Sequence, residues 1–336
     1  MSLTRHFHPV LRSSKLRTKP VRVEIDGHGY ALWRDATGTP RALHDRCPHR
    51  HAPLSAGRVR PDGRLACGYH GWHFDGAGHG ISPAVQDMKC EVDAFQLLEH
   101  HGWLWLAARE VARTALPVLA ADGWRFVGSY ALDAPAPLHV VVDNFSENEH
   151  TPYVHGRLGW REEDASRVTI DVRCLADRTE VTYTAPQRPS VLLPLVLVRD
   201  GDVLENRWVT RFSPIHSIYE LSWRDPKTDE RRPFSLRVGI VFVPRSVRST
   251  QIVSFLFSRL EGRHFVPRRV LDAAAYAMGW KEVWDDARWV HHVADTQRGF
   301  EGMRLTRFDK PLAHNRKLAD ALYHGADAIV PLRARR

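Results

Sequence analysis

Two short stretches of this sequence carry paired cysteine and histidine residues at spacings suited to holding a metal. Cys47 and His49 stand two positions apart, so an extended segment points both side chains to the same side. Cys67 and His70 stand three positions apart, a spacing that a tight turn closes, and Gly68 permits such a turn. The two loops therefore deliver two thiolates and two imidazoles to one centre.

This donor set has two interpretations. Two cysteines on one iron and two histidines on the other hold a Rieske [2Fe–2S] cluster. The same residue types hold zinc in zinc fingers, but there one loop carries both cysteines and the other carries both histidines. Each loop here carries one of each type, which favours the Rieske cluster. Trp72 and Tyr69 are expected to pack over the cluster, whereas His51 and His73 fall outside the ligand spacing.

A second set of metal-binding residue types follows further along the chain. Glu147 and His150 stand three positions apart, so they share a face if this stretch is helical. Pro152 disfavours helix for the residue before it, which gives a way to redirect His155. Two imidazoles and one carboxylate with open positions form the facial triad of non-haem Fe(II) oxygenases. Taken alone, the histidine pair also fits two surface or packed histidines, so its meaning depends on the cluster motif upstream.

Together the two motifs resemble the terminal oxygenase component of the Rieske non-haem iron oxygenases, in the branch with the vanillate and dicamba O-demethylases. The family pattern N-x-x-D-x-x-H-x4-H is met by Asn144, Glu147, His150 and His155. It departs at one position, since the acid is usually aspartate and here is Glu147. In the family this acid connects the iron site to the cluster of a neighbouring subunit. The resemblance therefore implies that the histidines bind iron and that Glu147 and Asn144 serve catalysis, with a solvated helix residue as the alternative for Glu147.

The resemblance also implies a third iron ligand, an aspartate on a late helix. Asp286 has Trp289 three positions later, which places it on an apolar stripe that faces the core. Asp285 has Glu282 and Arg288 three positions to either side, which indicates a solvent-facing environment. We therefore predict that Asp286 is the ligand, and Asp285 is the alternative.

The activity implied by the resemblance is that of a Rieske-type mono- or dioxygenase. Such an enzyme uses O2 at a mononuclear Fe(II) to hydroxylate or demethylate a small, largely apolar or aromatic organic substrate. The chain has no G-x-G-x-x-G before a predicted helix, so a separate ferredoxin or flavin reductase must supply electrons. The family implies a homotrimer. Apolar residues that are candidates for the pocket, although most are expected in the core, are Val191, Leu193, Leu195, Phe212, Ile240 and Phe255.

Two other functions compete with this one. A non-catalytic Rieske electron-transfer protein with a fused ligand-binding domain predicts two iron atoms per chain instead of three. A zinc-stabilised binding module predicts a colourless protein that binds nucleic acid in a salt-sensitive way. Metal analysis with an absorption spectrum separates all three.

The composition fits a cytoplasmic protein without nucleic-acid or membrane partners. The chain has 336 residues, of which 43% are hydrophobic, enough for one large or two moderate domains. Its N-terminus has no continuous apolar signal region, and no run is apolar for the roughly eighteen residues that span a bilayer. The net charge of +9 is spread along the chain, which argues against nucleic acid. This charge serves either to steer an acidic redox partner or to keep the protein soluble.

Two domains are expected to position these sites, in an α+β fold. Residues 1–110 show short alternating runs between Gly and Pro turns, which predicts an all-β Rieske domain. Residues 111–137 contain several prolines and are expected to be a connector. Residues 138–336 form the predicted mononuclear iron domain, and the resemblance makes it a helix-grip (START-like) antiparallel sheet with a long C-terminal helix.

The pattern within the second domain changes along the chain. Strand-like runs come first and helical runs follow. The strands are expected at 168–174, 180–184, 203–212, 217–223, 234–243 and 250–260, and the helices at 267–297 and 315–323.

Overall fold

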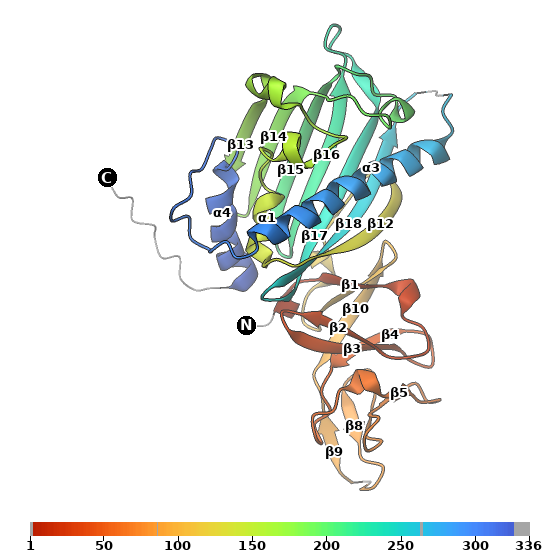
Figure 1. Cartoon of the computed structure of the whole chain (residues 1–336). Helices are drawn as coiled ribbons and strands as arrows, with labels where there is room; N and C mark the ends of the chain where they lie inside the picture. Colours follow the sequence, from red (N-terminus) through yellow and green to blue (C-terminus); the bar gives the residue numbers. More distant parts are fainter. Residues whose placement is uncertain (1–2, 86, 263–264, 326–336) are drawn as a thin grey trace. The chain divides into compact units, whose positions relative to one another are not determined.

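The structure, a computed structural model, describes residues 3–85, 87–262 and 265–325. Its contacts divide the chain into two compact units, both drawn in Figure 1. The first unit runs to residue 117 and also includes residues 245–247. The second unit comprises residues 118–244 and 248 onward.

The larger sheet of the first unit has six strands, in the order β1-β11-β10-β4-β3-β2. These strands are β1 His8–Arg12, β2 Val21–Ile25, β3 His28–Arg34, β4 Pro40–His44, β10 Ala94–His100 and β11 Trp103–Ala108. Strands β3 and β11 are buried along almost their whole length. Their apolar runs therefore form the core of this sheet.

The smaller sheet of the first unit positions the cluster motif. It has the order β5-β6-β7-β8-β9, with β5 Arg58–Val59, β6 Leu65–Ala66, β7 His73–Phe74, β8 His79–Ile81 and β9 Lys89–Glu91. The loop from β4 to β5 carries Cys47 and His49, and the loop from β6 to β7 carries Cys67 and His70. Both cysteines belong to a hydrophobic cluster that also contains Ala31, Trp33, Leu43, Leu54, Leu65, Trp72 and Phe74.

A seven-stranded sheet forms the second unit, in the order β12-β18-β17-β16-β15-β14-β13. Its strands are β12 Arg125–Ala134, β13 Thr169–Cys174, β14 Arg178–Pro186, β15 Val203–Phe212, β16 Ile215–Arg224, β17 Arg231–Ser246 and β18 Ser249–Leu260. From β13 to β18 each strand lies beside the next in the sequence, so the chain forms a meander. All six strands expected after residue 167 are present.

Strand β12 differs from the expectation for its segment. It lies within residues 111–137, the expected connector, yet pairs with β18 from Arg125 to Ala134. Gly128 and Ser129 interrupt the apolar alternation that would have indicated a strand. A Cβ at Gly128 would come within 3.0 Å of the Tyr276 ring. The residue that weakens the sequence pattern therefore gives an aromatic ring room to pack on the sheet.

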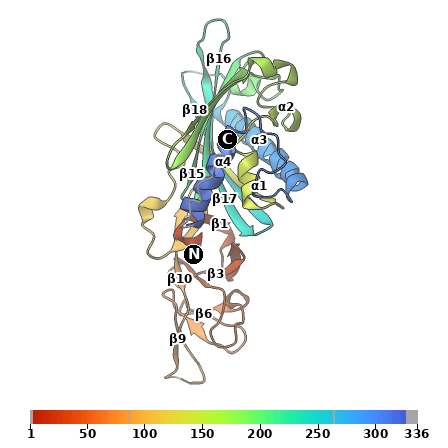
Figure 2. The ribbon, with the colours of Figure 1, turned by 90° about the vertical axis from the view of Figure 1, so that its left-hand side faces the viewer.

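Helices cover one face of this sheet (Figures 1 and 2). They are α1 Leu138–Asn144, α2 Thr151–Val154, α3 Arg268–Trp289 and α4 Lys310–Leu318, the last continued by a π-helical segment, Ala319–His324. Helix α3 packs along β12 and β18, and α4 packs against β13 and β14.

The long helix α3 has one buried stripe. Its inward residues recur every three or four positions: Leu271, Ala274, Ala275, Met278, Glu282, Val283 and Asp286. The helix ends at Trp289 and passes into a 3-10 turn, Val290–Val293, short of the expected end at residue 297. The β-branched valines at both ends of this turn favour an early end.

The observed architecture confirms the predicted α+β class. The first unit is all-β apart from short 3-10 turns, and the second is an antiparallel sheet with a long late helix. Over the described part of the chain, no helix has the length and apolarity needed to cross a membrane.

Candidate metal centres and the adjoining pocket

The first candidate metal centre is formed by the two loops of the smaller sheet. In the first loop, the amide of Cys47 donates to the carbonyl of Ala52 at 2.9 Å. In the second, the amide of Cys67 donates to the carbonyl of Trp72 at 2.7 Å. Each loop thus closes back on its own cysteine, so both thiols lie at the base of a loop.

A glycine makes the turn of the second loop, but it is not the expected one. Gly71 has a φ of +74° and donates to the carbonyl of Cys67 at 3.1 Å. A Cβ at Gly68 would lie 3.0 Å from the carbonyl oxygen of Ala56 in the neighbouring loop. Gly68 therefore allows the two loops to approach, while Gly71 supplies the left-handed turn.

The four side chains of this centre differ in exposure. Both cysteines are buried, whereas His49 and His70 are exposed, with ring centroids 4.5 Å apart. The indole of Trp72 stacks on His49 at 5.1 Å and 12°. Tyr69 contacts His70 but is 62% exposed. The centre is therefore closed on its thiol side and open to solvent on its imidazole side.

Burial raises the pKa of the Cys47 thiol to about 11, and the adjacent Cys67 sulfur adds to this effect. Metal binding would displace a proton from this thiol. Two enclosed sulfurs beside two facing imidazoles fit the donor set of a Rieske cluster.

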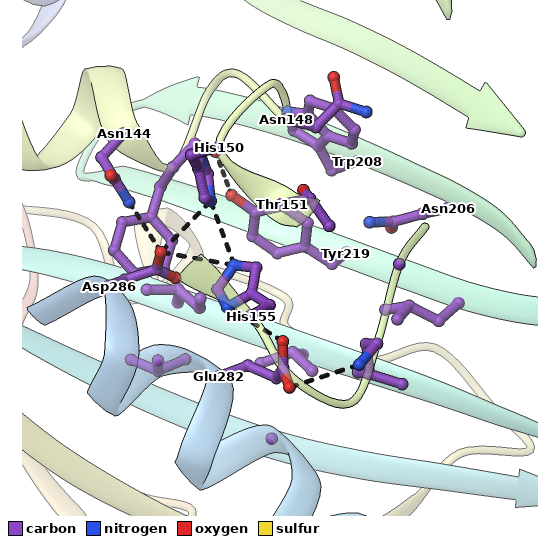
Figure 3. Close-up of a pocket in the computed structure, with 18 of the residues that line it drawn as sticks. Asn144, Asn148, His150, Thr151, His155, Asn206, Trp208, Tyr219, Glu282 and Asp286 are labelled. Carbon is purple, nitrogen blue, oxygen red and sulfur yellow. Dashed lines mark hydrogen bonds and ion pairs between the residues drawn. The ribbon is translucent and has the colours of Figure 1, made fainter. Parts of the chain in front are cut away.

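The second candidate metal centre draws its donors from two distant segments of the second unit. His150 precedes α2 and His155 follows it, so one short helix that contains Pro152 sets both imidazoles. Asp286 comes from the buried stripe of α3. One donor atom from each of the three lies within 4.8 Å of the other two (Figure 3). The two Nε2 atoms are 3.1 Å apart and lie 3.3 and 3.5 Å from Oδ1 of Asp286.

The two aspartate candidates on α3 lie in different environments. Asp286 is buried and belongs to the donor group. Asp285 pairs with the ammonium of Lys281, one turn earlier, and lies outside that group. The geometry therefore favours Asp286 as the candidate ligand.

Glu147 contacts His150, although not from a helix. The residues between α1 and α2 are not helical, so the two side chains do not share a helical face. The Glu147 carboxylate instead accepts the amides of Glu149 and His150, at 2.5 and 3.3 Å, and pairs with Nδ1 of His150. With Nδ1 held in this way, Nε2 of His150 faces the other donors.

Asn144 is the last residue of α1 and contacts the donor group through Asp286. Its Nδ2 donates to Oδ1 of Asp286 at 3.0 Å (Figure 3). Oδ1 is also the carboxylate oxygen that approaches both histidines. Asn144 therefore orients the candidate ligand.

Glu282 is a contributor that the sequence argument missed. Its Oε2 lies 3.0 Å from Nδ1 of His155, and its Oε1 accepts the amide of Leu158 at 3.4 Å. The sequence pattern around Asp285 indicates a solvent-facing position for Glu282, yet its side chain is only 11% exposed. Its position one turn before Asp286 could have predicted its burial, because the two residues share one stripe of the helix. Each candidate histidine thus has its own carboxylate at Nδ1.

Charges at this centre are strongly coupled. Burial works against protonation of His150, but the carboxylates of Glu147 and Asp286 outweigh it and raise its pKa to about 10. Burial lowers the pKa of His155 to about 4. Burial and the neighbouring Asp286 raise the pKa of Glu282 to about 8. Two imidazoles facing buried carboxylates form a set that a divalent cation would neutralise, and it is suited to Fe(II).

A pocket adjoins these donors and encloses about 760 Å³ of space, part of it open to solvent. The aromatic rings of Tyr183, Trp208 and Tyr219 line the pocket. Aliphatic side chains complete this part of the lining: Leu221, Leu236, Val238 and Ile240. Of the six apolar residues expected here, only Ile240 lines the pocket. Phe212 and Phe255 lie in the core, while Val191 is 87% exposed.

Comparison with known proteins identifies the first unit. Residues 6–94 match the family model described as the Rieske [2Fe-2S] domain. The match spans both cluster loops. The chain therefore contains a Rieske domain, and this domain indicates a [2Fe–2S] cluster.

Relatives extend the likeness beyond this domain. The chain is 31% identical over 218 residues to the vanillate O-demethylase oxygenase subunit of Pseudomonas sp. (strain HR199 / DSM 7063), a match that covers 60% of this chain and 59% of the relative. It is 30% identical over 191 residues to the 4beta-methylsterol monooxygenase of Methylococcus capsulatus, which covers 50% and 52%. The chain thus matches between half and three fifths of the length of these curated relatives.

The whole fold has a counterpart among solved structures. A crystal structure of dicamba monooxygenase bound to 3,6-dichlorosalicylic acid superposes with a TM-score of 0.77, covering 96% of this chain and 98% of the other at 19% identity. The two chains share a fold. These findings support the resemblance to the vanillate and dicamba branch that the motifs indicated.

Proposed function

We propose that this chain, with a Rieske [2Fe–2S] domain at residues 6–94, is the terminal oxygenase component of a Rieske non-haem iron oxygenase. It would use O2 and electrons from a separate reductase to hydroxylate or demethylate a small, largely apolar or aromatic substrate. One observation carries the proposal: a chain with a Rieske domain also groups His150, His155 and Asp286 beside an aromatic pocket.

Two sets of residues would hold the metals. The cluster would be held by two cysteines and two histidines: Cys47, Cys67, His49 and His70. The single iron would be held by His150, His155 and Asp286, three ligands that leave coordination positions open. When bound, the cluster supplies single electrons and the iron supplies the centre at which O2 is reduced.

Around the single iron, the surrounding residues fix the ligands. Glu147 pairs with Nδ1 of His150, and Glu282 lies 3.0 Å from Nδ1 of His155, which leaves both Nε2 atoms for the metal. Asn144 holds Oδ1 of Asp286. These contacts would help to orient the three ligands before iron binds.

The pocket places the substrate against these ligands. Its rings and several aliphatic side chains come from strands β14 to β17, and the two histidines are also part of its lining. An apolar substrate that fills this space excludes water and brings one of its carbons close to the donor group.

Electrons would enter through the exposed side of the Rieske domain. His49 and His70 are the solvent-facing ligands there, so we infer that a ferredoxin or flavin reductase docks over them. On the family resemblance we also infer a homotrimer in the cytoplasm, in which one subunit's cluster serves the iron site of the next. Glu147 is the candidate link in that route because it contacts His150.

The direct test combines metal analysis with oxygen uptake. We expect three iron atoms and two acid-labile sulfides per chain after anaerobic reconstitution, a Rieske absorption spectrum, and O2 uptake that depends on both substrate and reductase. Two iron atoms and no substrate-dependent uptake would instead identify a Rieske electron-transfer protein with a fused ligand-binding domain.

A further inference from the structure

Two asparagines in the pocket carry polar atoms that the protein leaves unpaired. Asn148 is 4% exposed, and neither its Oδ1 nor its Nδ2 has a hydrogen-bond partner. Oδ1 of Asn206 is also buried and without a partner. Both residues line the pocket (Figure 3). Because an unpaired buried amide is costly, such a pair indicates a bound molecule that completes the hydrogen bonds.

Other polar groups in the pocket walls are already occupied. The hydroxyl of Tyr219 donates to the carbonyl of Phe145. The hydroxyl of Tyr183 interacts with the side chain of Asn206. Trp208 stacks on Tyr219 with centroids 5.7 Å apart. The aromatic wall therefore offers flat apolar surface, and recognition of polar groups falls to the two asparagines.

Apart from the candidate iron ligands His150 and His155, the described lining of the pocket carries no basic side chain. Among the described residues that line it there is no lysine or arginine, whereas Glu147, Glu282 and Asp286 are carboxylic side chains. Arg188 belongs to the same unit but points its guanidinium at backbone carbonyls, those of Pro152, His155 and Trp160. Beyond the proposed iron site, no lysine or arginine of the described lining is thus available to pair with an anionic substrate.

We propose that the substrate is an uncharged aromatic compound with a group that both donates and accepts a hydrogen bond, a phenol or a secondary amide, read by Asn148. The proposal rests on the proposed function and narrows its substrate class. Only a group of this kind satisfies both atoms of the Asn148 amide. A carboxylate only accepts, so it could take the Nδ2 donor of Asn148 but would leave Oδ1 of both asparagines without a donor.

The relatives reported above are named for both charged and neutral substrates. One relative is named for vanillate, which carries a carboxylate, and another for a neutral sterol. The unpaired amide of Asn148 and the absence of lysine and arginine from the described lining favour the neutral class for this chain.

Three matched ligands test the proposal in the iron-loaded protein under nitrogen, by isothermal titration calorimetry. Guaiacol carries a methoxy group and a phenol, anisole lacks the phenol, and vanillate adds a carboxylate to guaiacol. We expect guaiacol to bind at least about tenfold more tightly than either of the others. Equal or tighter binding of vanillate would overturn the proposal, as would no binding of guaiacol up to millimolar concentration.

Two variants assign the effect to Asn148. Asn148→Leu keeps the shape and should reduce the preference for guaiacol over anisole to less than about threefold, without lowering the melting temperature, because no internal hydrogen bond is lost. Ser190→Ala is the matched control: it removes an unpaired buried hydroxyl outside the pocket and should leave the preference unchanged. An unchanged preference in Asn148→Leu would refute the role of Asn148.

The results that would contradict the proposed function differ from those that would contradict the substrate class. Binding is measured without O2, so it does not require turnover. A protein with three iron atoms that consumes O2 with vanillate but not with guaiacol would keep the oxygenase assignment and lose the substrate class. A protein that binds guaiacol but holds only two iron atoms would keep the binding preference and lose the oxygenase assignment.

Discussion

The two candidate metal centres of this chain are built in opposite ways. The Rieske centre takes its donors from two neighbouring loops and leaves His49 and His70 in contact with solvent. The second centre joins the flanks of α2 to a residue on α3, and its donors are enclosed. An exposed imidazole suits exchange of electrons with another protein, whereas an enclosed centre beside an apolar pocket suits chemistry that water would interrupt.

The support around the donors differs as well. In the Rieske loops, backbone amides close back on the cysteines and an indole stacks on one histidine. In the second centre, the carboxylate of Glu147 pairs with His150 and that of Glu282 lies beside His155. The first centre is therefore maintained by local backbone geometry, and the second depends on tertiary contacts.

The largest effect is expected from His150→Ala, which should affect only the enclosed centre. Turnover should fall more than about a thousandfold because one of three ligands is lost, and iron should fall from three atoms per chain to two. The Rieske absorption spectrum should not change. Loss of that spectrum would mean that the two centres are not independent.

A smaller effect is expected from Glu282→Gln. It removes the carboxylate at His155 and should weaken iron binding about 10- to 100-fold, measured by competition with a chelator. Asp285→Asn is the matched control on the same helix and should change binding less than about threefold. A larger loss in Asp285→Asn than in Glu282→Gln would reverse the assignment of the two faces of α3.

Asn144→Ala tests a single hydrogen bond in the enclosed centre. It removes the donor to Oδ1 of Asp286 and should weaken iron binding about tenfold, as expected for a hydrogen bond to a charged group. Chelator competition measures this change too. Unaltered iron affinity would show that Asp286 is oriented by α3 alone.

The smallest effect is expected at the Rieske centre, the open centre, whose two histidines are exposed to solvent. Reduction of the cluster by an acidic ferredoxin should slow about threefold in Arg50→Glu, since Arg50 is exposed beside His49 and the charge of the loop is reversed. Raising the salt concentration should slow reduction of the unmodified protein as well. Lys227→Glu, an exposed change in the second unit, is the control and should leave the rate within experimental error. A rate of cluster reduction that does not depend on salt would contradict electrostatic steering of the partner.

The sequence predicted the open centre more completely than the enclosed one. Cys47 and His49, like Cys67 and His70, are close in the chain, so spacing alone indicated a shared site. The sequence did not show that Gly71, and not Gly68, makes the turn, because both glycines of that loop fit a turn. The late aspartate could be chosen only because helical periodicity separates Asp286 from Asp285.

What the sequence did not predict depends on contacts between distant segments. Glu282 looks like a surface residue until α2 is packed against α3, where it meets His155. Strand β12 has a weak apolar alternation because Gly128 makes room for Tyr276, a residue of α3. The unpaired amide of Asn148 also carries no signal in the sequence, since pairing is a property of the folded pocket.

Asp286 lies on α3, far from the two histidines in the sequence, and this separation has a consequence for the stability of the protein. An iron ion bound as proposed would tie helix α3 to the segment around α2, because it would bind only when both are folded. At a free iron concentration of a hundred times the dissociation constant, this linkage would add about 2.7 kcal/mol to the free energy of unfolding. Iron starvation would therefore leave more of the chain open to proteases, and the abundance of the protein would follow the iron supply of the cell.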